Sequence, residues 1–393
     1  MEHTKINYLL CASLREWRRW NESRTLQFIT VIGPLVSFFL VAWLFSSNVP
    51  RELPVAIVDL DHTALSRQMV RMVDATAIAS VNRNYTSLDE ARLAMEEGRV
   101  DAIVCIPKNT EKDVFRGYGA NIALYLNNTN VLKGGLLNSG IRKALSTFST
   151  GMKLQIQLKN GLTQEQALSR VMPVQLRQVL LFNPYTSYSY YLTAALMPVL
   201  LIVFVLIGSV YVMGDELYKG TGPQWIRCGG GNFMIALLGK MLPYTVCYGL
   251  LAMVMNLVLF QFLGMPLHGH LGIILFSEFL LILSYQSFSI LLLAVTSNLR
   301  LSLSLGSAYC MLALTYSGLT FPVFGMPLAA HIFSKILPFT YWLKILISQS
   351  LRGEPVTNNF TPLFSLLLFI IFGVLFIPRL RTMLLNRKRW GKI

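Results

Sequence analysis

The sequence is poor in charged residues, and acidic residues are the scarcer kind. Charged residues make up 13% of the 393 positions, with 19 Asp and Glu against 34 Lys and Arg. An ordinary soluble domain carries roughly 25% charged residues. The chain is instead 54% hydrophobic, and a helix that crosses a bilayer needs about 20 apolar residues. The composition therefore indicates an integral membrane protein.

The formal net charge of +15 does not indicate a nucleic-acid-binding protein, because of where the charges lie. Most acidic residues fall between Arg51 and Arg177, mixed with basic ones, and the basic excess flanks the first and last apolar stretches. Short cytoplasmic segments of membrane proteins are enriched in Lys and Arg. The charge pattern therefore reports topology, and we expect no nucleic-acid partner.

Residues that could carry catalysis or bind a metal or nucleotide are scarce. Only Cys105 of the five cysteines lies in the large hydrophilic insert, which excludes an internal disulfide there. His268 and His270 share a short loop without nearby carboxylates, and Asp59 with Asp61 ends a strand pattern, where the two acids cap the next helix. The chain has no Walker A or GxSxG motif. We expect no catalytic residue, no metal and no cofactor bound by this chain.

Six apolar stretches are long enough to cross a membrane. They are Leu26–Phe45, Leu192–Met213, Met241–Leu263, Leu271–Val295, Leu301–Phe321 and Phe360–Pro378. The amphipathic pattern of residues 1–24 predicts a helix at the cytoplasmic interface. The alternative is a plain basic flank of the first span, residues 25–47. The fold class expected is a polytopic α-helical membrane protein with six transmembrane helices.

The basic residues orient this arrangement. The N-terminal flank, the loop 214–232, the turn at Arg300 and the basic tail 383–393 all lie on one side of a six-span chain. The short loop on the other side contains no Lys or Arg. The positive-inside rule puts the basic side in the cytoplasm. Both termini are then cytoplasmic, residues 48–187 are extracytoplasmic, and a five-span region follows over 188–382.

The insert 48–187 alternates between strand and helix patterns. Strand-like runs at 54–61, 78–86, 101–107 and 121–128 are interleaved with helical segments at 63–76 and 87–100. A long helix follows from Leu132 to about Lys159, with candidate breaks at Gly134–Gly135 and Gly140, and then a second over Thr163–Val179. These patterns predict an inserted α+β extracytoplasmic domain, an α/β layer with long helices.

Residues 326–353 form an apolar run that is too interrupted for a comfortable span. Pro327, Lys335, Pro338 and Lys344 break it. We expect a re-entrant hairpin on the outer side, which contains Pro338 and Tyr341. The alternative, an ordinary seventh span, would put the basic tail outside, and the charge rule disfavours that.

Several side chains in the predicted spans are candidates for a substrate path or gate. Glu278 lies inside the fourth span, where an ionisable group is costly and often functional. A hydrogen bond from a neighbouring span is the other explanation. Tyr188 and Tyr191 begin the second span as an aromatic belt or a gate, and Tyr309 and Tyr316 lie in the fifth.

The order of these segments resembles the permease subunit of type-2 ABC (ABC-2) exporters, in the YhhJ/YbhR-like subgroup that has a large extracytoplasmic domain after the first span. The run VAIVDLDHTALSR from Val55 resembles the start of that domain, which is also similar to YhgE/Pip-like membrane proteins. FNPYTSYSYYLTAALMP, ending at Pro198, resembles the family's entry into the second span. LPFTYWLKILISQSLRG, Leu337 to Gly353, resembles its outer hairpin.

The loop GDELYKGTGPQWIR resembles the family's Glu-x-x-x-Gly-Thr coupling segment, a short helix that docks on the ATPase. The resemblance implies a coupling role for Glu216, Gly220, Thr221, Trp225 and Arg227. Gly222-Pro223 replaces the family's usual Leu-Glu. Because Pro is tolerated in a helix's first turn, we still expect a helix from about Pro223 to Cys228. A plain connector is the alternative.

The resemblance implies export of a hydrophobic or amphipathic compound (drug, lipid-like or small molecule) across the bacterial cytoplasmic (inner) membrane, with spans two and five lining the path. The implied partners are a separate ABC ATPase subunit, which holds ATP and Mg, a second identical or related permease, membrane lipids, and a periplasmic adaptor or membrane fusion protein. A non-transporting receptor or scaffold presenting the outer domain is the alternative, and a membrane-embedded enzyme ranks third.

Overall fold

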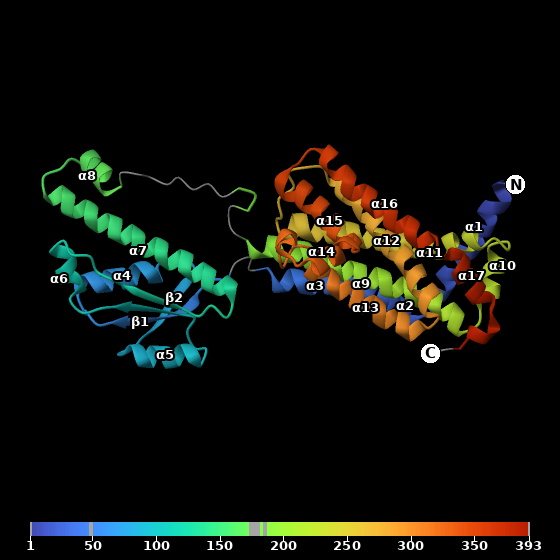
Figure 1. The fold of residues 1–393 in the computed structure, drawn as a ribbon, viewed down its shortest axis with the longest axis horizontal. Helices are drawn as coiled ribbons and strands as arrows, with labels where there is room; N and C mark the ends of the chain where they lie inside the picture. The colour runs from blue at the N-terminus through green and yellow to red at the C-terminus, as the bar shows by residue number, and fades with distance from the viewer. Residues whose placement is uncertain (1, 47–49, 173–180, 184–186, 392–393) are drawn as a thin grey trace. The chain divides into compact units, whose positions relative to one another are not determined.

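The structure, a computed structural model, describes residues 2–46, 50–172, 181–183 and 187–391 (Figure 1). The chain divides into two compact units. We call Met1–Asn48 with Leu180–Ile393 the transmembrane unit, and Val49–Val179 the inserted unit.

Five helices among the described residues are long and apolar enough to cross a membrane. They are Arg24–Leu44, Ser189–Tyr218, Phe233–Phe262, Leu271–Thr296 and Val356–Leu385. In Figure 1 they correspond to α2 (Arg24–Gln27) with α3 (Gly33–Leu44), α9 (Tyr188–Tyr218), α11 (Phe233–Leu257), α12 (Leu271–Thr296), and α16 (Phe360–Val374) with α17 (Ile377–Leu385). They coincide with five of the six predicted spans and confirm a polytopic, mostly helical membrane protein.

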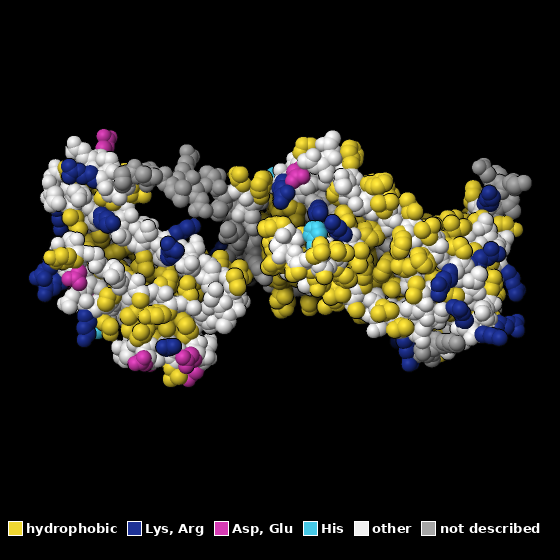
Figure 2. Space-filling view, in the orientation of Figure 1, with side chains coloured by type: hydrophobic (Ala, Val, Ile, Leu, Met, Phe, Trp, Pro, Cys, Tyr) yellow, Lys and Arg dark blue, Asp and Glu magenta, His cyan; other side chains and the backbone are white. Residues whose placement is uncertain are grey.

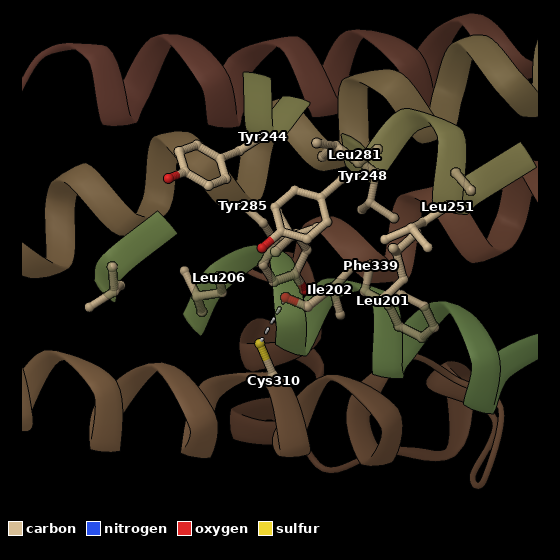
Figure 3. Packing of buried hydrophobic residues seen from close by; sticks show 14 of the residues in the cluster. Leu201, Ile202, Leu206, Tyr244, Tyr248, Leu251, Leu281, Tyr285, Cys310 and Phe339 are labelled. Atoms are coloured by element: carbon tan, nitrogen blue, oxygen red, sulfur yellow. Dashed lines mark hydrogen bonds between the residues drawn. The ribbon is translucent and has the colours of Figure 1, made fainter. Parts of the chain in front are cut away.

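The predicted fifth span, Leu301–Phe321, corresponds to α13 (Leu299–Tyr316), which is shorter than expected. It is not among the five span candidates, because Arg300 and several serines dilute its apolar character. The helix nevertheless packs along α9, and the Cys310 thiol approaches the Ile202 carbonyl at 3.8 Å (Figure 3). α13 is therefore part of the helix bundle.

Aromatic and small polar side chains hold the bundle together. Tyr244, Tyr248 and Tyr285 are buried among leucines (Figure 3), and the Tyr248 hydroxyl donates to the Phe204 carbonyl at 3.0 Å. The polar middle of α12 is buried. Its Ser287 hydroxyl donates to the Ile370 carbonyl of α16 at 2.7 Å. Small residues and interhelical hydrogen bonds of this kind are typical of helix contacts in membranes.

The two ends of the transmembrane unit differ. Both termini lie at one end, with α1 (Glu2–Glu22), α10 (Gly222–Cys228), α17 and the short turn Arg387–Arg389 (Figure 1). Figure 2 shows Lys and Arg side chains gathered at this end, while hydrophobic side chains cover the middle of the unit. This is the distribution expected of a helical bundle in a bilayer.

The segment 326–353 forms two short helical segments, α14 (Leu328–Lys335) and α15 (Pro338–Ile347), and a π-helical turn over Ser348–Arg352 continues α15. Helices of this length do not cross a bilayer. Beyond α15, Gln349 accepts a hydrogen bond from the His270 amide at 3.0 Å and ties the hairpin to the loop before α12. The broken pattern in the sequence corresponds to two helices, of which the first ends at Lys335 and the second begins at Pro338, and the re-entrant hairpin on the outer side stays a prediction.

The inserted unit contains a four-stranded sheet in the order β2-β1-β3-β4, parallel except for β4. Its elements are β1 (Leu53–Asp59), α4 (Ala64–Asp74), β2 (Ala79–Asn84), α5 (Leu88–Glu96), β3 (Ala102–Ile106), α6 (Thr110–Phe115), β4 (Ala123–Leu126), α7 (Val131–Lys159) and α8 (Gln164–Val171). The four strand patterns are confirmed, and α6 is an addition that the sequence did not predict.

Alternation along β1 explains how the sheet is covered on both faces. Val55 and Ile57 point to the core under α4 and α7. Ala56 and Val58 point to the core under α5. Successive strand residues face opposite sides, and parallel strands buried on both faces need such continuous apolar runs.

Three details of the inserted unit refine the sequence predictions. α7 continues through Gly134–Gly135 and Gly140 without a break. α8 ends at Val171, and the rest of the predicted Thr163–Val179 helix lies mostly outside the described residues. Asp59 accepts hydrogen bonds from the Ser66 hydroxyl at 2.7 Å and from two amides of the following turn, which agrees with the capping interpretation.

Replacing Gly373 of α16 by Ala should destabilise the bundle. An added Cβ would lie 2.2 Å from the Ser287 hydroxyl oxygen and 2.4 Å from its carbonyl oxygen, so α12 and α16 must separate. We expect a loss of about 1–3 kcal/mol in unfolding free energy, measured by denaturant titration in detergent. Gly249→Ala on α11, where an added Cβ meets no described atom within 4 Å, is the control. Equal stability of the two variants would contradict this packing.

Candidate functional site

A buried ammonium group lies where three helices meet. Lys240 of α11 is 0% exposed, and its Nζ lies 2.6 Å from Glu16 Oε1 of α1 and 2.9 Å from Glu216 Oε1 of α9. The two carboxylate side chains are 1% and 0% exposed. Since a buried charge without a partner is very costly, each of these groups depends on the others.

Two arginines of α1 extend this cluster toward the surface. Arg15 Nη1 lies 2.8 Å from Glu216 Oε1. Arg19 pairs with Glu216 and, at 2.5 Å, with Asp215 Oδ2. Burial alone would lower the pKa of Arg19, but Glu16, Glu216 and Asp215 raise it above its ordinary value. Arg19 therefore stays charged across the physiological pH range.

Close backbone approach lets α1 lie against α11. A Cβ at Gly239 would lie 2.7 Å from the Ala12 Cβ, and the Ser13 hydroxyl donates to the Gly239 carbonyl at 2.9 Å. Only glycine permits this contact. The N-terminal segment is therefore a helix of 21 residues that packs on the bundle. This excludes the alternative of a plain basic flank of the first span.

The loop after α9 is held by the same cluster. The Thr221 hydroxyl donates to Glu216. Gly220 has a φ of +67°, and an added Cβ would lie 2.6 Å from the Trp390 ring of the C-terminal tail. Trp225 is 1% exposed, its indole donates to the Ala236 carbonyl at 2.9 Å, and Lys240 Nζ lies 4.8 Å from its ring centroid. The contacts of these residues hold the loop against the helix bundle and the C-terminal tail.

A short helix follows this loop, at the position the sequence predicted. α10 runs from Gly222 to Cys228 with Pro223 in its first turn. Trp225 and Ile226 are buried, whereas Gln224 and Arg227 are exposed. Glu216 and Trp225 therefore cannot contact another protein directly in this arrangement. Of the residues that the resemblance implicated, Arg227 is the one on the surface of α10.

The buried acid Glu278 is 1% exposed and accepts a hydrogen bond from Asn256 Nδ2 of α11 at 2.6 Å. A bond from a neighbouring span was one of the two explanations that the sequence left open. The transport role stays a hypothesis. Asn256 itself had no distinguishing sequence pattern.

The candidate tyrosines make contacts at the hairpin end. Tyr191 donates to the Leu319 carbonyl. Tyr309 donates to the Ile336 carbonyl at 2.7 Å, and Tyr316 packs edge-on against Phe333 with ring centroids 5.1 Å apart. These contacts join α9 and α13 to the segment between α13 and α15.

Two further predicted residues belong to the hairpin, and one lies outside the description. Pro338 begins α15, and the Tyr341 hydroxyl donates to the Lys335 carbonyl at 3.1 Å. The Tyr188 side chain lies outside the described residues. Among the side chains that the structure describes, none of the His, Cys, Asp and Glu groups is arranged to hold a metal ion.

Sequence reasoning missed Lys240, Glu16 and Trp390. Lys240 directly precedes the predicted span Met241–Leu263 but lies inside the observed helix Phe233–Phe262, and an ionisable residue within an apolar helix is a signal in itself. Glu16 stands between Arg15 and Arg19 on a helix whose other charges are mostly basic. Trp390 had no signal, because its partner Gly220 is remote in the sequence.

Apolar helices with a folded unit inserted after the first, and a charge cluster that fixes a short helix at one end, are the features of a polytopic helical membrane protein. The chain belongs to the ABC-2 family transporter proteins, a family that matches residues 24–377. It is a transporter permease of the inner membrane and not an enzyme, and the family implies an ABC ATPase subunit as a partner.

Two curated relatives match almost the whole chain. The probable multidrug ABC transporter permease YbhS of Escherichia coli (strain K12) is 24% identical over 360 residues, which covers 88% of this chain and 89% of the relative. The protein of the same name from Escherichia coli O157:H7 matches to the same extent.

Glu216→Gln should loosen α1 from the bundle, because a neutral amide cannot balance Lys240. We expect a loss of about 3 kcal/mol in unfolding free energy, at the low end for a broken buried pair because Glu16 still faces Lys240. Trypsin should also cleave faster at Arg15 and Arg19. Glu22→Gln, an exposed change at the end of the same helix, is the control. Unchanged stability and cleavage would rule out the cluster as the anchor of α1.

Proposed function

We propose that this chain is the membrane-spanning subunit of an ATP-driven exporter with six transmembrane helices. Both termini are cytoplasmic, and residues of about 48–187 lie outside the membrane. Two observations support this topology. The termini lie at the same end of the transmembrane unit (Figure 1), which requires an even number of crossings, and α13 supplies the sixth. Basic side chains gather at that end (Figure 2), as the positive-inside rule requires of the cytoplasmic side.

The observation that carries the proposal is the anchoring of α10. A seven-residue helix has little stability of its own, yet this one is fixed by buried Trp225 and by the loop that Glu216 holds. Its exposed residues, Gln224 and Arg227, face away from the bundle. An anchored helix with a free face is suited to receive force from a second protein, and a non-transporting scaffold has no need of it.

The charge cluster supplies a route from α10 into the membrane. Lys240 joins α11 to α1 and α9, so a push on α10 moves these helices together. ATP and Mg bind the partner ATPase, whose closure would tilt the helices between inward-facing and outward-facing states. This is a rigid-body change biased by ligand binding.

The cargo proposed is a hydrophobic or amphipathic compound, a drug, lipid-like or other small molecule. Support comes from the relative whose name describes a probable multidrug permease. α9 and α13, the second and fifth helices to cross, would line the path together with those of a second, identical or related permease. The inserted unit would pass cargo onward or bind a periplasmic adaptor.

Arg227→Glu should weaken association with the partner ATPase subunit, because the change reverses the charge on the exposed face of α10 without touching its buried side. We expect at least a tenfold loss of co-purified ATPase, which corresponds to about 1.4 kcal/mol. The denaturation midpoint should stay unchanged.

Lys335→Glu, an exposed charge reversal on the hairpin at the other end of the unit, is the matched control. Undiminished association in Arg227→Glu and in a Gln224→Glu/Arg227→Glu double variant would refute the coupling assignment and favour the scaffold. Loss of association in Lys335→Glu would refute the proposed orientation.

A further inference from the structure

The inserted unit contains a cleft of about 700 Å³, within the range of small-molecule sites. α4, α6, α7, α8 and the segment 117–122 surround it. Its lining includes Phe148, Met152, Ile156, Lys153 and Arg170. Neither the coupling site nor the candidate substrate path uses any of these residues.

One face of α7 explains why the cleft is apolar. Leu145, Phe148, Met152 and Ile156 recur at the spacing of a single helical stripe. The earlier part of α7 packs on the sheet and α4, with Leu137 fully buried. Farther along, Met152 and Ile156 are only half-buried, so the apolar stripe continues past its packing partners into the cleft.

The segment 117–122 contributes three small residues to the lining, beside Tyr118 and Ile122. Gly117, Gly119 and Ala120 follow α6. A Cβ added at Gly117 or Gly119 would meet no described atom within 4 Å. A larger side chain at either position would therefore meet no described atom close to its Cβ.

The charges that line the cleft have one sign. Lys153 of α7 and Arg170 of α8 are its charged residues, and both are exposed. Within the described part of the chain, neither forms an ion pair. An apolar groove with two unpaired cations attracts a molecule that has an apolar body and a negative group.

We propose that this cleft binds an amphipathic organic anion, with its apolar body against Phe148, Met152 and Ile156 and its acidic group near Lys153 and Arg170. The inference rests on the proposed function for the origin of the ligand, because an exporter of amphipathic compounds delivers them to the side where the inserted unit lies. A membrane-derived fatty acid and a non-lipid anion share this chemistry.

The test uses the full chain in phosphatidylcholine nanodiscs and a hexadecanoic acid that carries a diazirine. After illumination, mass spectrometry should map the label to residues 117–122 and 145–157. The alcohol with the same chain should label these peptides at least roughly fivefold less, because it lacks the charge that the two cations attract. Equal labelling by acid and alcohol would overturn the charge assignment.

Two pairs of variants distinguish labelling within the cleft from nonspecific labelling by the probe. Gly119→Trp fills the cleft and should abolish labelling. Gly151→Trp, on α7 but outside the lining and equally free of close described atoms, should not. Lys153→Gln/Arg170→Gln should reduce labelling roughly fivefold, whereas Lys143→Gln/Lys159→Gln should leave it unchanged. Labelling that survives Gly119→Trp would overturn the site.

Competition identifies the source of the ligand. Displacement of the probe by 1-anilinonaphthalene-8-sulfonate as well as by unlabelled hexadecanoic acid supports a site for anions in general. Displacement by the fatty acid alone supports a lipid source. Displacement by neither overturns a saturable site.

The same samples keep this inference separate from the exporter proposal. If labelling fails while Arg227→Glu still releases the ATPase, the exporter proposal stands and the binding site is wrong. If labelling is confined to the cleft while Arg227→Glu retains the ATPase, the binding site stands and the exporter proposal is wrong.

Discussion

The transmembrane unit depends on a single buried ammonium group. Lys240 has no contact with solvent and is balanced by Glu16 and Glu216, which come from two other helices. Breaking a buried ion pair by removal of one partner costs about 3–5 kcal/mol, comparable with a large part of a protein's net stability. α1, α9 and α11 are therefore bound to one another at this end.

The same ion-pair cluster holds the short helix α10 against the helix bundle. Glu216 is buried, holds Thr221 and faces Lys240, whose ammonium also lies over the Trp225 ring. The buried residues of the segment that resembles a coupling motif thus stabilise the loop from within. The exposed face of α10 remains available to a partner. Under the proposed function, force applied there by the ATPase would pass to helices that cross the membrane.

Patterns local in the sequence predicted much of the fold. Apolar length located five of the six predicted spans, the apolar run at 54–61 located the strand β1, and the interruptions at Pro327 and Pro338 predicted a break in the helix. Such patterns state which face of an element is buried. They do not state which element covers it. The α13 helix was predicted too long because Leu319 and Phe321 extend the apolar run past the end of the helix at Tyr316.

The site was less predictable for the same reason. Lys240 and Glu16 are separated by 224 positions, and helical spacing cannot pair residues so far apart. The motif located Glu216 and Trp225 but suggested that they contact the ATPase. Their burial indicates instead that they stabilise the loop and α10. The roles of Asn256 and Trp390 depend on their contacts with Glu278 and Gly220, which are distant in the sequence.

The central claim is that Glu216 and Lys240 stabilise the bundle through each other, and a double-mutant cycle tests it most directly. Glu216→Gln, Lys240→Met and the double variant would be unfolded in detergent. The account predicts that the double variant loses at least about 1 kcal/mol less than the sum of the single variants. Additive losses, within about 0.5 kcal/mol, would contradict it.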